Sequence, residues 1–111
     1  MDLPYEISPT EAKDRLSVSK QAVLIDVREP VEYALAHLEG GLLVPMHSVP
    51  AEFQRLEGLA GEADLLILCH HGVRSLQVVS WLRAQGLDNC TSIAGGIDRW
   101  STQVDPSIPR Y

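Results

Sequence analysis

The residues of this chain with the greatest chemical potential run from Cys69 to Ser75, with the sequence Cys-His-His-Gly-Val-Arg-Ser. They follow a short, continuous apolar run at residues 65–68, which is typical of a buried strand. Apolar residues then recur with helical spacing until Gly86, which supplies a helix stop. A cysteine therefore stands where a strand ends and a helix begins, and Ser75 is the predicted N-cap of that helix.

This position favours a reactive thiol. Ligands of parallel sheets bind beyond the carboxyl ends of the strands, and a helix N-terminus presents unpaired N–H groups and a partial positive charge. Gly72 permits a tight curl of N–H groups, and Arg74 adds a permanent charge. We therefore expect Cys69 to ionise readily and to act as a nucleophile. The alternative is a buried, structural cysteine.

Length and composition indicate one ordinary globular domain. The chain has 111 residues, of which 45% are hydrophobic and 22% charged, so residues 1–111 are expected to form a single domain. The formal net charge of −6 argues against nucleic acid as a partner, which requires a basic face. Two cysteines are too few for a disulfide scaffold, and neither has a partner at zinc-site spacing, so no metal site is predicted.

No targeting or membrane segment is predicted. The first residues are acidic and contain no apolar core, unlike a signal peptide. No apolar run approaches the roughly 18 residues of a membrane span, so no membrane partner is expected. We expect a cytoplasmic protein.

Strand and helix patterns alternate along the whole chain, which indicates parallel βαβ units and an α/β fold. Ser8, Pro9 and Glu11 form a helix-start signature with a capping box. Strands are predicted at residues 5–7, 22–27, 42–44, 65–68 and 89–94. Helices are predicted at 8 to about 16 or 18, 30–36, 50–59, 75 to about 82, and 97–102, followed by a Pro-punctuated tail at 104–111.

Four motifs in order resemble the single-domain rhodaneses, which are thiosulfate and persulfide sulfurtransferases. The loop from Cys69 to Ser75 is similar to their active-site loop. The other three matches are Asp26-Val27-Arg28-Glu29 with Glu32-Tyr33, His37-Leu38-Glu39-Gly40 with Val44-Pro45, and Ala94-Gly95-Gly96 with Trp100. The resemblance covers nearly the whole chain and implies a rhodanese-like domain, with a central parallel five-stranded sheet and helices on both faces.

The resemblance also implies a reaction. Cys69 takes a sulfane sulfur from thiosulfate or a persulfide, becomes a persulfide itself, and passes the sulfur to a thiol or cyanide. The substrate-binding residues it implies are His70, His71, Gly72, Val73, Arg74 and Ser75, whose backbone N–H groups can stabilise an anionic sulfur. Asp26 and Arg28 are expected to support the loops, as an ion pair in one interpretation. The partners implied are a small-molecule donor and acceptor or a protein persulfide, and no cofactor or metal is implied.

Three other functions differ from this one in their sequence requirements. Related Cys-based phosphatases have one more residue between cysteine and arginine than the four found here, so a phosphatase is disfavoured. A regulatory module without catalysis usually lacks the cysteine. A sulfur-relay subunit, which accepts sulfur from a protein persulfide, stays open. Cys90 is interpreted as a core residue rather than a resolving thiol, Trp81 and Trp100 as packing residues, and His37 as structural.

Overall fold

The computed structural model describes residues 4–17 and 21–111 of the chain. Its centre is a sheet of five parallel strands in the order β1-β5-β4-β2-β3. The strands are β1 (Glu6–Ile7), β2 (Ala22–Asp26), β3 (Leu42–Leu43), β4 (Asp64–Leu68) and β5 (Cys90–Ile93). The predicted α/β class and five-stranded parallel sheet are confirmed.

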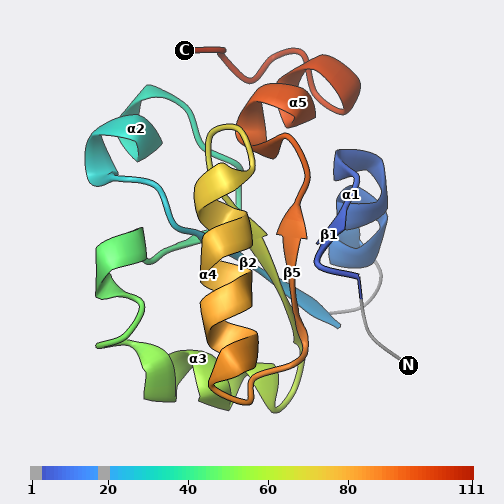
Figure 1. The fold of residues 1–111 in the computed structure, drawn as a ribbon. Coiled ribbons are helices and arrows are strands. Elements are labelled where there is room, and N and C mark those ends of the chain that lie inside the picture. The colour runs from blue at the N-terminus through green and yellow to red at the C-terminus, as the bar shows by residue number, and fades with distance from the viewer. Residues whose placement is uncertain (1–3, 18–20) are drawn as a thin grey trace.

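Helices cover both faces of this sheet, as predicted (Figure 1). One face carries α1 (Pro9–Ser17) and α5 (Gly96–Gln103), and the other carries α3 (Phe53–Ala60) and α4 (Val73–Ala84). The short helix α2 (Pro30–Leu35) follows β2 at the carboxyl end of the sheet, and a 3₁₀ turn, η1 (Met46–Ser48), follows β3. The η1 turn was not predicted. Among the described residues, no helix combines the length and apolar character that spanning a membrane requires.

The core is divided between these two faces by the alternation of side chains along the central strand. In β4, Leu65 and Ile67 pack with the α3 and α4 side, whereas Leu66 and Leu68 pack with the α1 and α5 side. All four side chains are fully buried. A strand buried on both faces has no polar positions, which explains the continuous apolar run in the sequence.

The register of the strands brings three chain segments together at one edge. Asp26 pairs with Leu68, and Ile67 pairs with Ser92. The residues that follow β2, β4 and β5 therefore leave the sheet side by side at its carboxyl end. Cys69 is the first residue beyond β4, so it lies at this edge.

Two helix starts show how local sequence determines the boundaries. The N–H of Glu11 donates to Ser8 Oγ (3.1 Å), which confirms Ser8 as the cap of α1. The predicted N-cap of α4 was wrong, because Gly72 caps this helix and α4 begins at Val73. Ser75 lies inside the first turn, where its side chain has other partners. The alternative end of α1 at Val18 falls outside the described residues.

Candidate active site

Cys69 lies at the bottom of the loop that joins β4 to α4. Its side chain is buried, with 1% of its surface exposed. The backbone N–H groups of Gly72 and Ser75 donate to Cys69 Sγ over 3.0 and 3.3 Å. Val73 also belongs to the first turn of α4, where N–H groups have no intrahelical acceptor. The loop therefore surrounds one sulfur atom with N–H donors.

Ser75 adds a hydroxyl group to this environment. The Cys69 thiol and Ser75 Oγ are 3.3 Å apart, and Ser75 Oγ is 2.7 Å from the hydroxyl oxygen of Ser92 on β5. Both serine side chains are fully buried. The pair can therefore reorient its protons, accepting from a thiol or donating to a thiolate.

Glycines make the tight curl of this loop possible. Gly72 has φ +97°, and a Cβ there would lie 2.9 Å from the backbone nitrogen of Gly95. A Cβ at Gly96 would collide with the carbonyl oxygens of Cys69 and His70. Those carbonyls accept from the N–H groups of Ile97 (2.8 Å) and Asp98 (3.1 Å) in the first turn of α5. The first turn of α5 therefore holds the cysteine loop in place.

Arg74 is held by a carboxylate. Its guanidinium forms a bidentate ion pair with Glu32 of α2, at 2.6 and 2.8 Å. This pairing lowers the pKa of Glu32 to about 2 and raises the pKa of Arg74. The geometry thus gives Arg74 the loop-bracing role, and direct anion binding stays a prediction.

The expected ion pair between Asp26 and Arg28 is confirmed. Arg28 is completely buried and donates from Nη2 (2.7 Å) and Nε (2.9 Å) to the carboxylate of Asp26. A third bond runs from Nη2 to the carbonyl of Ala36 (2.8 Å), at the end of α2. A buried charge needs such complete pairing. The pair fixes α2, and with it Glu32, above the cysteine loop.

The two loop histidines have different environments. His71 is mostly exposed, whereas the His70 ring lies between those of His71 and Tyr111, with centroids 3.8 and 3.9 Å away. Burial, with the nearby charge of His71, lowers the pKa of His70, so its neutral form is favoured at pH 7. Substrate binding by His70 and His71 stays a prediction.

Cys90 belongs to the core, as interpreted. It is fully buried, and burial raises the pKa of its thiol. Cys90 is paired with Leu65, four residues before Cys69 along β4. At about 3.3 Å per residue the two cysteines are displaced by about 13 Å along the sheet, beyond the reach of a disulfide. Both are free, and Cys90 cannot resolve an intermediate on Cys69 without rearrangement.

The two tryptophans and His37 have packing roles. Trp100 is buried in the α1 and α5 cluster, and Trp81 packs edge-on against Phe53 with ring centroids 5.9 Å apart. His37 stacks on Tyr33 and its Nδ1 lies 3.1 Å from the carbonyl of that residue. These contacts agree with their interpretation as structural residues.

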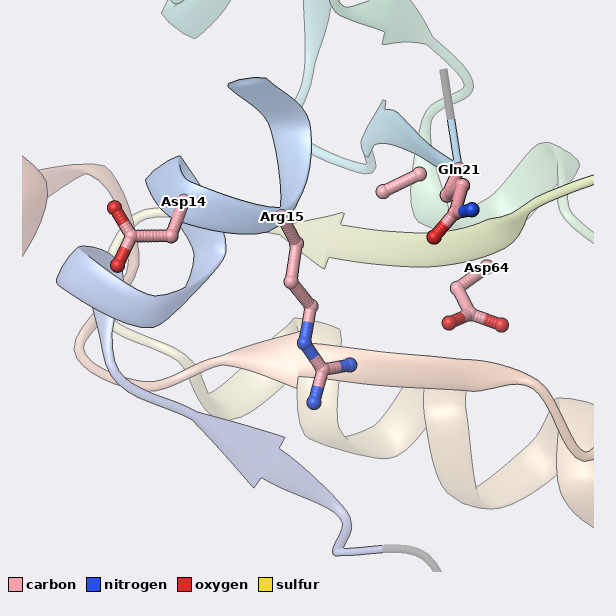
Figure 2. A pocket seen from close by; sticks show the side chains of 5 residues that line it. Asp14, Arg15, Gln21 and Asp64 are labelled. Carbon is pink, nitrogen blue, oxygen red and sulfur yellow. The ribbon is translucent and has the colours of Figure 1, made fainter. Parts of the chain in front are cut away.

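A separate hollow lies at the opposite end of the sheet (Figure 2). It is lined by Asp14, Arg15, Gln21, Ala22 and Asp64. Ala22 and Asp64 are the first residues of β2 and β4, so this hollow is remote from Cys69. Within residues 4–17 and 21–111, no cluster of three potential metal ligands occurs.

Comparison with known proteins agrees with this geometry. The model of the rhodanese-like domain matches residues 8–103. The chain belongs to the rhodanese-like family. It is 32% identical over 107 residues to the thiosulfate sulfurtransferase GlpE of Haemophilus influenzae, covering 96% of each protein. The structure of the human single-domain sulfurtransferase TSTD1 superposes with a TM-score of 0.73 at 27% identity, covering 91% of this chain and 98% of that one.

Several rhodanese-like relatives are much longer than this chain. The Rhodanese-like/PpiC domain-containing protein 12 of Arabidopsis thaliana is 42% identical over 92 residues, which are 82% of this chain but 31% of that protein. Other relatives have names that include both adenylyltransferase and sulfurtransferase, and the chain spans 25% to 27% of the length of these proteins.

Three residues at the site were not recognised from the sequence as parts of it. Glu32 was noted only within a motif, although its pairing with Arg74 joins α2 to the loop. Ser92 could have been suspected, because a hydroxyl inside a buried strand must find a hydrogen-bond partner. Tyr111 gave no signal, since it stands in an irregular tail that no periodicity describes.

Proposed function

We propose that residues 1–111 form a single rhodanese domain that transfers a sulfane sulfur through a persulfide on Cys69. The observation that carries the proposal is the pair of backbone N–H groups, from Gly72 and Ser75, that donate to Cys69 Sγ. Such donors favour a thiolate and then an anionic persulfide sulfur. The two free cysteines fit a reducing compartment, and a cytoplasmic location is part of this proposal.

In the first half of the reaction, the Cys69 thiolate attacks the outer sulfur of thiosulfate. A new S–S bond forms to Cys69 while the bond between the two thiosulfate sulfurs breaks, and sulfite leaves with the electron pair. In the second half, cyanide or a thiolate attacks the outer sulfur of the persulfide, and Cys69 leaves as a thiolate. Because each nucleophile attacks as an anion and each leaving group departs as one, this cycle needs no strong base.

The surroundings of Arg74 favour this reaction over phosphate chemistry. The guanidinium is paired with both oxygens of Glu32, so its two terminal nitrogens already have a carboxylate as partner. The backbone of Gly72 also lies against that of Gly95, which leaves the loop little room to widen. A single sulfur is a better match for such a loop than a phosphate group.

Sulfur relay from a protein is the second candidate. Exposed apolar side chains occur on the helices that hold the loop, among them Val73 at the start of α4, with 65% of its surface exposed, and Val31 and Leu35 on α2, with 69% and 57% exposed. Apolar side chains on this end of the molecule suit contact with a protein that delivers or receives sulfur.

Steady-state kinetics with two donors test both candidates. We expect turnover with thiosulfate and cyanide in the wild type, none in Cys69→Ser, and near-normal turnover in Cys90→Ser as the matched control. Absence of thiosulfate turnover, combined with loading of Cys69 from a persulfidated protein, would favour relay. Activity retained in Cys69→Ser would refute both.

A further inference from the structure

The segment after α5, residues 104–111, runs across the carboxyl end of the sheet (Figure 1). Side chains make two of the contacts that fasten it to α5 before Tyr111. Ser101 Oγ donates to the carbonyl of Ile108 (2.6 Å), and Arg110 forms an ion pair with Asp98 (2.8 Å). Asp98 lies in the first turn of α5, which also holds the carbonyl of His70. The segment is therefore fastened to the same structure that supports the cysteine loop.

Tyr111 lies over this loop. Its ring is stacked on His70 at 3.9 Å with an interplanar angle of 8°. Its hydroxyl oxygen accepts from Arg28 Nη1 and its proton is donated to Glu32 Oε2, both over 2.8 Å. Burial raises the pKa of Tyr111, so the phenol keeps the proton that this second bond requires at neutral pH.

These contacts span the loop from its beginning to its end. His70 directly follows Cys69, and Glu32 holds Arg74. Oε2 of Glu32 accepts from both Arg74 Nη2 and the hydroxyl of Tyr111, each over 2.8 Å, so Tyr111 and the end of the loop share one carboxylate oxygen. Cys69 itself is 1% exposed, so a reagent must pass the loop that Tyr111 contacts in order to reach it.

We propose that Tyr111 is a specificity-determining residue, which admits small nucleophiles to the Cys69 persulfide and disfavours bulky thiols. This inference rests on the proposed sulfur transfer. The acceptor thiolate must attack the outer sulfur, forming a new S–S bond as the bond to Cys69 breaks and Cys69 receives the electron pair. A small ion needs only a narrow approach for this step, whereas a peptide thiol needs Tyr111 to move.

Displacing Tyr111 is feasible because one buried polar atom lacks a hydrogen bond while Tyr111 lies over the loop. Nε2 of His70 is buried and has no hydrogen-bond partner among the described residues. A buried polar atom without a partner is costly. Opening the segment would expose this nitrogen to water or to an acceptor, which offsets part of the loss of the Tyr111 contacts.

The first test measures access to Cys69 without any sulfur transfer. Alkylation rates with iodoacetamide and with a bulky maleimide are compared, and the labelled cysteine is identified by peptide mass. We expect Tyr111→Ala to raise the ratio of bulky to small reagent rates by about three- to tenfold, the factor that corresponds to one hydrogen bond. Tyr111→Phe, which keeps the ring, should fall between Tyr111→Ala and wild type.

The matched control is Tyr5→Ala. Tyr5 is also a partly exposed tyrosine beside an arginine, with Arg83 over its ring at 4.5 Å, but it precedes β1, and Arg83 belongs to the last turn of α4, at the end away from the loop. Tyr5→Ala should leave the ratio of bulky to small reagent rates unchanged. An unchanged ratio in both Tyr111 variants would overturn the proposal, and so would an equal rise in Tyr5→Ala.

The second test compares kcat/KM for glutathione and for cyanide with thiosulfate as donor. We expect Tyr111→Ala to raise the preference for glutathione, with the change in KM for glutathione rather than in kcat with cyanide. A preference identical to wild type would contradict the role of Tyr111. If no variant transfers sulfur while the alkylation ratio still rises, the proposed function fails and the covering role of Tyr111 is retained.

Discussion

The ion pair between Glu32 and Arg74 should couple α2 to the cysteine loop energetically. It is bidentate, at 2.6 and 2.8 Å, and its side chains are 16% and 32% exposed. The perturbation is a double-mutant cycle built from Glu32→Gln, Arg74→Gln and the double variant. Gln is nearly isosteric with Glu and keeps an acceptor for Tyr111, so the cycle isolates the charge interaction.

The expected magnitude follows from the pKa of Glu32. The pairing with Arg74 lowers that pKa from 4.5 to about 2. Each pKa unit corresponds to about 1.4 kcal/mol, so the upper bound is about 3 kcal/mol. Partial exposure and salt screening reduce this value, and we expect a coupling energy of about 2 kcal/mol at pH 7.

The sign of the pH dependence follows from the same value. A carboxyl whose pKa is lower in the folded state stabilises that state above its unfolded pKa, here about 4.5. This contribution is lost as the pH falls through the folded pKa of about 2. The stability difference between wild type and Glu32→Gln should therefore be constant near neutrality and shrink as the pH falls below about 4.5.

Urea unfolding followed by circular dichroism provides the measurement. The exposed pair between Arg15 and Glu11 is the matched control, because its distance of 2.8 Å is similar but its side chains are 37% and 51% exposed. A cycle on that pair should give about 0.3–0.5 kcal/mol. Coupling between Glu32 and Arg74 no larger than in this control would refute the bracing role of Arg74.

Three further substitutions test other parts of the site. Gly96→Ala should lower the free energy of unfolding, measured in urea, by at least about 2 kcal/mol, because φ at this position is +62° and a Cβ would meet the carbonyl of Cys69. Ser75→Ala should lower kcat with thiosulfate about tenfold. It should also lower the free energy of unfolding by about 1–3 kcal/mol, because the hydroxyl of Ser92 loses its hydrogen-bond partner. Unchanged kinetics would remove the Ser75 hydroxyl from the mechanism. Cys90→Ser should keep kcat near wild type, and a large loss would mean that Cys90 is more than a core residue.

The layered fold was predictable because its signals are local and agree with one another. The continuous apolar run of β4 identifies a strand buried on both faces, and the cap at Ser8 identifies a helix start. Alternating strands and helices then require a parallel sheet. The position of the cysteine loop was also predictable, since ligands bind at the carboxyl end of the central strands.

The remaining features depend on contacts between residues far apart in the sequence. Propensity suggested Ser75 as a helix cap, but Gly72 caps the helix, and the Ser75 hydroxyl faces Cys69 and Ser92 instead. Tyr111 is 79 residues from Glu32, and no periodic pattern links them. Such pairs arise only when the sheet has brought separate segments to one edge.

Intact-protein mass spectrometry after incubation with thiosulfate tests the central claim most directly. We predict a gain of one sulfur, about 32 Da, that cyanide removes and that Cys69→Ser prevents, because Cys69 carries the sulfur between donor and acceptor. The Cys90→Ser variant should gain the same mass. A sulfur gained equally by Cys69→Ser, or one that cyanide does not remove, would contradict the persulfide mechanism.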